Sequence, residues 1–183
     1  MKTLAYFPVI MLALGASALG SAERLTITSG KKISITPSAL VKAQKKSTAG
    51  RASSDRKSIT FKGKLARLVV QTGPGNDMMS YRIQGLRNPT LMVNPGAMLH
   101  ILFVNTDDDM FHSLRFTTKV APFEAKMGAK GSWGSMDLPH KSANAFFAQE
   151  ITVKVPKTKG TYSYVCVVAG HAAAGMFGTL IVR

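Results

Sequence analysis

The sequence predicts an all-β protein, folded as an antiparallel sandwich or barrel of short strands. Three observations lead to this prediction. Short apolar segments recur after residue 58, turn-forming runs such as Gly73-Pro74-Gly75 and Asn94-Pro95-Gly96 separate them, and no long helical period appears after residue 50. The expected helix content is therefore confined to the first part of the chain.

The first 22 residues are predicted to be a signal peptide. Lys2 precedes an apolar stretch from Tyr6 to Leu14, and two runs of small residues, Ala16-Ser17-Ala18 and Gly20-Ser21-Ala22, offer cleavage sites. An uncleaved membrane anchor is the alternative, because no charged residue occurs between positions 3 and 22. The segment thus predicts export to the periplasm, with membrane association through the N-terminus if it is retained.

A basic extension is expected at residues 23–58. Residues 23–67 contain twelve of the 24 Lys and Arg residues but only two of the nine acidic residues. Two short strands, Arg24–Thr28 and Lys32–Ile35, precede a short helix that Thr36 caps and that runs from Pro37 to about Lys46. The extension is either a solvated, partly mobile segment or a charged surface for an acidic partner or an anionic membrane. Nucleic acid is not an expected partner, since no recognisable binding module is present.

Residues 59–183 are expected to form the single folded domain. The predicted strands are Ile59–Gln71, Tyr81–Gln84, Thr90–Val93, Met98–Asn105, His112–Thr117, Phe146–Val155, Thr161–Cys166 and Phe177–Val182.

Three soft metal ligands lie between the last two predicted strands. Cys166, His171 and Met176 follow one another at equal five-residue intervals. The lone cysteine cannot form a disulfide within the chain. In an exported protein an exposed free thiol is a liability, so Cys166 is expected to have a chemical role, and the alternative is a small buried apolar residue. Two histidines, one cysteine and a weak methionine form the ligand set of a blue-copper electron-transfer site. A second histidine must therefore come from elsewhere in the chain.

Of the other histidines, His112 is the best candidate, because it lies at a junction between a loop and a strand. His100 lies inside an apolar strand and is predicted to be a structural core residue, whereas His140 follows Pro139 in a loop and is predicted to be solvated.

Other chemistries fit the pattern less well. Structural zinc sites do not use methionine, and a two-copper centre needs a second cysteine. A cysteine protease would need an oxyanion site that no motif here supplies, and neither nucleotide-binding glycine motif is present. The chain is therefore not expected to be an enzyme.

The C-terminal motifs resemble those of the cupredoxins, most closely the rusticyanin-like members of that family. The resemblance covers residues 85–183. Two of the similar stretches lie before the first histidine, namely Asn88–Leu91 and Phe103–Thr106, which leads into His112-Ser113. Three more contain the other ligands, namely Gly160–Cys166, Gly170–Ala173 and Gly175–Gly178. It implies a Greek-key β-sandwich holding one type 1 copper ion on His112, Cys166, His171 and Met176. It also implies that Asn105 braces the ligand loops and hydrogen-bonds near the cysteine sulfur, and that Ser113 contributes similarly.

The resemblance further implies a monomeric electron carrier that shuttles single electrons between partners such as c-type cytochromes of a periplasmic respiratory chain. The expected docking surface is a small apolar patch around the last histidine, made of Met110, Phe111, Ala172, Ala173 and Phe177. The alternative is an accessory copper protein that docks on and stabilises a cytochrome or a terminal oxidase.

Overall fold

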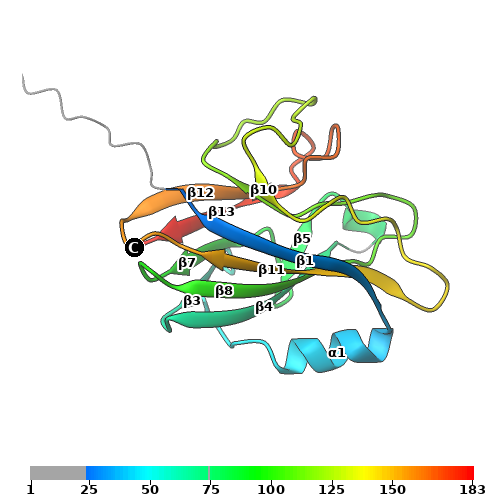
Figure 1. Ribbon diagram of the computed structural model, residues 1–183, viewed down its shortest axis with the longest axis horizontal. Coiled ribbons are helices and arrows are strands. Elements are labelled where there is room, and N and C mark those ends of the chain that lie inside the picture. The colour runs from blue at the N-terminus through cyan, green and yellow to red at the C-terminus, as the bar shows by residue number, and fades with distance from the viewer. Residues whose placement is uncertain (1–23, 74) are drawn as a thin grey trace, which may run out of the picture.

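Two β-sheets pack face to face in the computed structural model, which describes residues 24–73 and 75–183 (Figure 1). The predicted signal peptide lies outside the described residues. One sheet has the strand order β1 (Thr26–Ile35), β11 (Phe146–Lys154), β8 (Met98–Asn105), β4 (Leu65–Thr72), β5 (Tyr81–Ile83) and β6 (Leu86–Arg87). The other has the order β10 (Trp133–Gly134), β9 (Arg115–Thr117), β12 (Gly160–Val165), β13 (Phe177–Val182), β7 (Thr90–Val93), β3 (Ser58–Phe61) and β2 (Arg51–Ala52). Besides a short 3₁₀ turn (Gly75–Asp77), the described helical structure is α1 (Pro37–Lys45), so the predicted all-β sandwich with one short helix is confirmed.

The core lies between the sheets because alternate side chains of each strand point inward. Leu99, Ile101 and Phe103 of β8 are all buried there. Two fully buried tyrosines cross the core, and their hydroxyl groups donate to backbone carbonyls: Tyr81 to Ser113 and Tyr164 to Pro89. A buried hydroxyl needs such a partner, and one of the two, Ser113, lies next to His112 in the sequence.

The sandwich contains parallel strand pairs in addition to the predicted antiparallel ones. The pairs β4–β8, β7–β13 and β3–β7 are parallel. The chain repeatedly crosses from one sheet to the other, as it does between β7 and β8, so strands that are distant in sequence become parallel neighbours. Periodicity reports which residues are buried, but it carries no information on strand direction.

Two predicted strands also need correction, and three short strands were not predicted. Residues 59–71 form two strands, β3 and β4, which belong to different sheets and are joined by a short turn at Gly63. The strand predicted from His112 begins only at Arg115, and His112 instead forms an isolated bridge with Leu138. The two-residue strands β2, β6 and β10 are too short to produce a detectable pattern.

The basic extension is built into the sandwich. Its two predicted strands are one long strand, β1, which pairs antiparallel with β11 from Thr26 to Ile35 with a register shift between Ser29 and Lys32. The predicted helix is confirmed as α1, capped by the Thr36 hydroxyl, which accepts from the N–H of Ala39. The one buried residue of this helix, Leu40, packs against residues of β4, β8 and β11. Within the part of the chain that is described, no helix is long and apolar enough to cross a membrane.

Candidate metal centre

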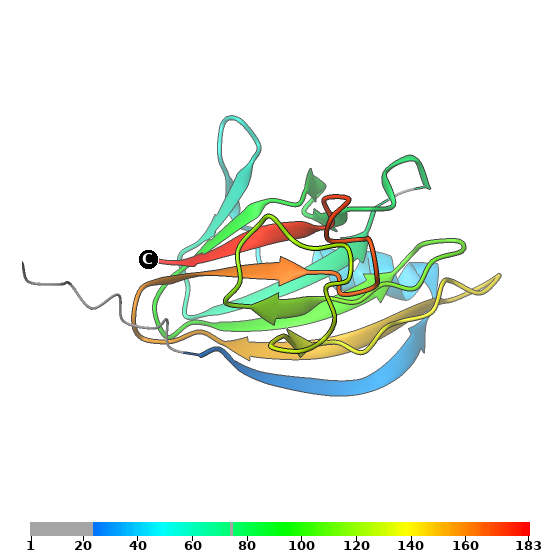
Figure 2. The ribbon, with the colours of Figure 1, turned by 90° about the horizontal axis from the view of Figure 1, so that it is seen from above.

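The loop of residues 166–176 connects two neighbouring antiparallel strands, β12 and β13, so both of its ends are fixed (Figure 2). Backbone hydrogen bonds close it: the N–H of Cys166 donates to the carbonyl of Met176, and the N–H of Met176 donates to the carbonyl of His171. Gly170 and Gly175 adopt φ angles of 86° and 100°, a region that side chains with a Cβ rarely enter. The loop therefore folds back tightly, and Met176 returns to the level of Cys166.

His112 approaches the same point from a different part of the chain. Its backbone N–H and carbonyl both bond to Leu138, at 3.1 and 2.8 Å. The Asn105 amide, at the end of β8, donates to the carbonyls of Met110, Leu138 and Pro139. These bonds fix the segment that carries His112 against the chain around residue 138, beside the ligand loop.

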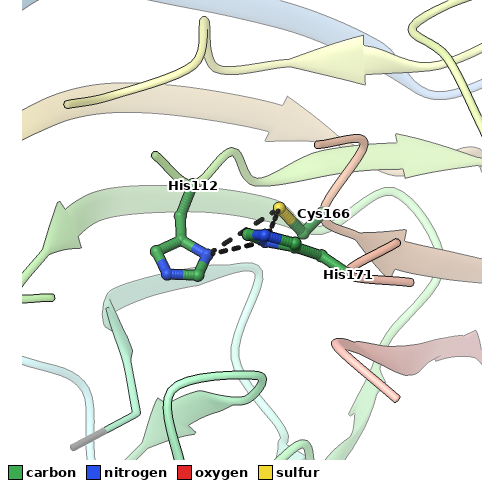
Figure 3. A group of neighbouring side chains, drawn as sticks. All are labelled: His112, Cys166 and His171. Atoms are coloured by element: carbon green, nitrogen blue, oxygen red, sulfur yellow. Dashed lines mark hydrogen bonds between the residues drawn. The ribbon is translucent and has the colours of Figure 1, made fainter. Parts of the chain in front are cut away.

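The three side chains converge in a buried cluster (Figure 3). The Nδ1 atom of His171 lies 3.2 Å from Nδ1 of His112 and 3.4 Å from Sγ of Cys166, and the distance from Sγ to Nδ1 of His112 is 4.0 Å. His112 and Cys166 are fully buried, whereas His171 is 6% exposed. Atoms that share one metal ion through bonds of about 2.0–2.3 Å lie about 3–4 Å apart, so these donors fit a single ion.

Comparisons with known proteins agree with this donor set. Residues 68–183 match the family described as copper binding proteins of the plastocyanin/azurin family. The chain belongs to this family of cupredoxins.

Two curated relatives and two solved structures are rusticyanins. The relative from Acidithiobacillus ferrooxidans is 36% identical over 78% of this chain and 91% of its own length, and that from Acidithiobacillus ferridurans is 32% identical over 93% and 90%. A structure of reduced rusticyanin aligns with a TM-score of 0.75 and 30% identity over 84% of this chain and all of that one. The 1.27 Å structure of rusticyanin from Thiobacillus ferrooxidans aligns with a TM-score of 0.75 and 32% identity, over 84% of this chain and 97% of that one. The predicted resemblance is confirmed: the chain is a rusticyanin-like cupredoxin, a copper protein of the electron-carrier type.

Burial sets the protonation of the donors in this cupredoxin. Burial raises the pKa of the Cys166 thiol, against the opposing effect of hydrogen bonds from Ser113. Burial also lowers the pKa of His112, against the attraction of Asp107, and it lowers that of His171 with a further contribution from His112. The metal-free site at neutral pH thus holds a thiol and two neutral imidazoles, and a metal that binds the sulfur must displace its proton.

The orientation of His112 favours a cation at the centre of the cluster. Its Nε2 atom lies 3.0 Å from a carboxylate oxygen of Asp107, so the ring proton belongs on Nε2. The lone pair of Nδ1 then points toward Nδ1 of His171 and the sulfur. Nitrogen and sulfur atoms whose lone pairs face one another within 4 Å can all bind one metal ion placed between them.

The two expected bracing residues, Asn105 and Ser113, make different contacts. The contacts to the sulfur come from Ser113, whose N–H lies 3.4 Å and whose hydroxyl lies 3.8 Å from Sγ. The same hydroxyl accepts from the N–H of Val167 at 3.1 Å, so Ser113 ties the two ligand segments together. The bonds that the structure shows for Asn105 go to loop carbonyls, to Thr72 and to the N–H of Asp107 instead of to the sulfur.

Two of the other predicted positions need correction, and one does not. His100 is exposed on the outer face of its sheet, 3.2 Å from the sulfur of Met98, and is not a core histidine. Ala172 is buried against Val165 and Val167 and contributes little surface for docking. His140 is exposed, as predicted, and its ring meets that of Phe111 edge-on.

One functional residue was missed by the sequence reasoning. Asp107 belongs to the run Asp107-Asp108-Asp109, whose composition suggests only an acidic loop. The structure buries Asp107 beside His112 and leaves the other two exposed. The only signal in the sequence was the position of an acidic run five residues before a candidate ligand.

Proposed function

We propose that this chain is a type 1 copper electron-transfer protein in which His112, Cys166, His171 and Met176 hold one copper ion. The observation that carries the proposal is the convergence of two imidazole nitrogens and one thiol sulfur in a buried cluster of a copper-binding family member. Met176 would be the weak fourth ligand, because it is fully buried and its backbone bonds to both Cys166 and His171. Bound copper supplies a reversible one-electron couple at this site.

The residues of the chain keep the donors in one arrangement. Ser113 bonds to both the sulfur and the backbone of Val167. Asn105 donates to the carbonyl of Met110, just before His112, and to that of Leu138, which pairs with His112. Backbone bonds within the loop fix His171 relative to Cys166. Donors that are held by so many bonds move little when the charge at the site changes, which favours fast electron transfer.

A copper titration tests the proposal. The metal-free protein should bind one equivalent of Cu(II) and develop an intense visible absorption from the bond between the metal and the thiolate. Cys166→Ser should lose this absorption and keep the circular dichroism spectrum of the folded sandwich. Intense absorption that persists in Cys166→Ser would exclude the proposed ligand set.

The proposed partner is a c-type cytochrome or a terminal oxidase in the periplasm, met by a monomeric carrier at the surface beside His171. The predicted signal peptide supports the location. Phe111, 50% exposed, and the exposed Ala173 are the apolar residues available there, with Met110 and Phe177 half-buried beside them. Small apolar contacts of this kind suit brief redox encounters.

Stopped-flow oxidation of a reduced c-type cytochrome tests this docking surface. Phe111→Ala should slow the second-order rate several-fold, with the reduction potential unchanged. Leu65→Ala is the matched control, because Leu65 is also an exposed apolar residue but lies at the opposite end of the sandwich, opposite the first residue of β8. Equal rates for the two variants would remove Phe111 from the docking surface.

The accessory role remains a second proposal, favoured by the basic extension. Lys42, Lys45 and Lys46 are exposed on and after α1, which is anchored to the sandwich by Leu40 and by β1. An accessory protein would bind its acidic partner through this surface whether or not copper is present. Cys166→Ser should therefore still co-purify with the oxidase if the role is accessory, whereas a carrier would exchange electrons rapidly and dissociate.

A further inference from the structure

The carboxylate of Asp107 is enclosed by hydrogen-bond donors. Its Oδ1 atom accepts from the backbone N–H groups of Asp109 and Met110, at 3.0 and 3.1 Å. Its Oδ2 atom lies 3.0 Å from Nε2 of His112. The side chain is only 2% exposed, so these contacts replace water.

The contacts determine both the charge of Asp107 and the proton position on His112. An aspartate is ionised at neutral pH, and here the contacts from two backbone N–H groups and from His112 favour the carboxylate form. Backbone N–H groups can only donate, so Oδ1 must be an acceptor. The ionised Oδ2 is also an acceptor, so Nε2 of His112 must carry the ring proton and Nδ1 must carry the lone pair.

We propose that Asp107 is a positioning residue that holds His112 in the Nε2–H tautomer and places a fixed negative charge next to the copper site, which lowers its reduction potential. The first half concerns the metal-free protein. The second half rests on the proposed function, because it requires copper on His112. The physical reason is that a nearby anion, together with a hydrogen bond that makes the imidazole a stronger donor, favours Cu(II) over Cu(I).

The neighbouring aspartates provide a natural contrast. Asp108 and Asp109 are both exposed, and Asp108 pairs with Lys141. The acidic run therefore contains one inward charge that contacts a site residue and two outward charges in water. Exposed charges are screened by solvent, so their effect on the site should be much smaller.

An amide cannot replace this carboxylate. Asparagine has one acceptor oxygen and one donor nitrogen, whereas the site needs acceptors on both sides. If the oxygen of an asparagine at this position faced the backbone N–H groups, its NH₂ group would face Nε2 of His112 and would favour the opposite tautomer. Asp107→Asn therefore removes the charge and disturbs the tautomer together.

Nitrogen-15 NMR of the metal-free protein at pH 7.5 tests the tautomer without any copper and without a variant. His112 should show a protonated Nε2 and an unprotonated Nδ1, with slow exchange of the Nε2 proton. In Asp107→Asn the protonated Nε2 form should lose its dominance, whereas it should persist in Asp108→Asn. A wild-type spectrum with Nδ1 protonated, or with the two tautomers averaged, would overturn the proposal.

Voltammetry of the copper-loaded proteins tests the charge. Asp107→Asn should shift the equilibrium between Cu(II) and Cu(I) at least tenfold toward Cu(I), which is a rise in potential of about 59 mV for one electron. Asp108→Asn, which removes the same formal charge at the next position, should shift it much less. Equal shifts, or no shift in Asp107→Asn, would overturn this half. Failure of the wild type to form a type 1 copper site would instead reject the proposed function and leave the tautomer result standing.

Discussion

The two chain segments that supply the clustered donors are organised in opposite ways. In the loop of residues 166–176 the backbone positions the side chains. Hydrogen bonds between main-chain groups and two glycines with positive φ set the spacing of Cys166, His171 and Met176. In the segment of residues 105–113, side-chain bonds are added to the two backbone bonds between His112 and Leu138, since Asn105 and Asp107 bond to carbonyls, N–H groups and the ring of His112. The loop fixes the positions of its donors. The segment around His112 also fixes which ring nitrogen of His112 carries the proton, and it places the charge of Asp107 beside that ring.

The largest expected effect is the loss of a donor from the side-chain segment. His112→Ala should weaken Cu(II) binding by at least about 100-fold, because a buried imidazole that has no replacement is removed. His100→Ala is the control, since His100 is exposed on the outer face of the sheet. Isothermal titration with a competing chelator measures both. A larger loss in His100→Ala would place the site elsewhere.

The next effect concerns the bonds that shape the segment. Asn105→Ala removes an amide that donates to three carbonyls, some of them buried, and should lower the free energy of unfolding by about 2–3 kcal/mol. Asn144→Ala, in an exposed turn, should change it by less than about 0.5 kcal/mol. Urea unfolding of the metal-free proteins gives both values. If Asn105→Ala were as mild as Asn144→Ala, side-chain bonds would not be what holds this segment.

The same contrast explains what the sequence could predict. The ligand loop is local: Cys166, His171 and Met176 lie within eleven residues between two alternating strands, so spacing and flanking pattern identify them. The segment around His112 depends on partners that are distant in sequence, such as Leu138 and Thr72. No periodicity reports those contacts. The role of Asp107 was missed for a different reason: its partners Asp109, Met110 and His112 are local, but an acidic run does not indicate which of its carboxylates is buried. The apolar strand around His100 does not indicate which of its two faces is exposed.

Strand direction shows the same limit at the level of the fold. Alternation correctly located β7, β8 and β13 to the residue. The sequence pattern merged β3 and β4, because the three residues that separate these strands, with Gly63 in the middle, interrupt the apolar pattern too briefly. Burial periodicity is a property of one strand, whereas pairing and crossover depend on several strands at once.

Acidification should weaken the metal-free protein in two stages, and each stage reports on different groups. The pKa values of His112 and His171 are lowered in the folded state, so their contribution is complete above about pH 6.5 and is lost as the pH falls below it. The pKa values of Asp77 and Asp107 are also lowered, so their contribution is lost only below about pH 4. Urea unfolding between pH 8 and 3 measures the profile.

The control for the first stage is a choice between histidines. His171→Ala should reduce the loss of stability between pH 7.5 and 5.5, because one of the two buried imidazoles is gone. His140→Ala should leave that loss unchanged, since His140 is exposed. If the stability of the wild-type protein were constant over this range, folding would not lower the pKa values of His112 and His171.

The smallest expected effect is at Met176, the end of the backbone-organised loop. A weak axial thioether contributes little to copper affinity but donates some density to Cu(II), the more electron-poor state. Met176→Leu keeps the apolar volume and removes the donor, so copper should remain bound and the potential should rise. Met176→Gln offers a harder oxygen donor that favours Cu(II), so the potential should fall. Shifts of about 59 mV correspond to a tenfold change in the equilibrium and are measurable by protein-film voltammetry. If both variants kept the wild-type potential with copper bound, Met176 would be a core residue only, and the loop would supply two ligands instead of three.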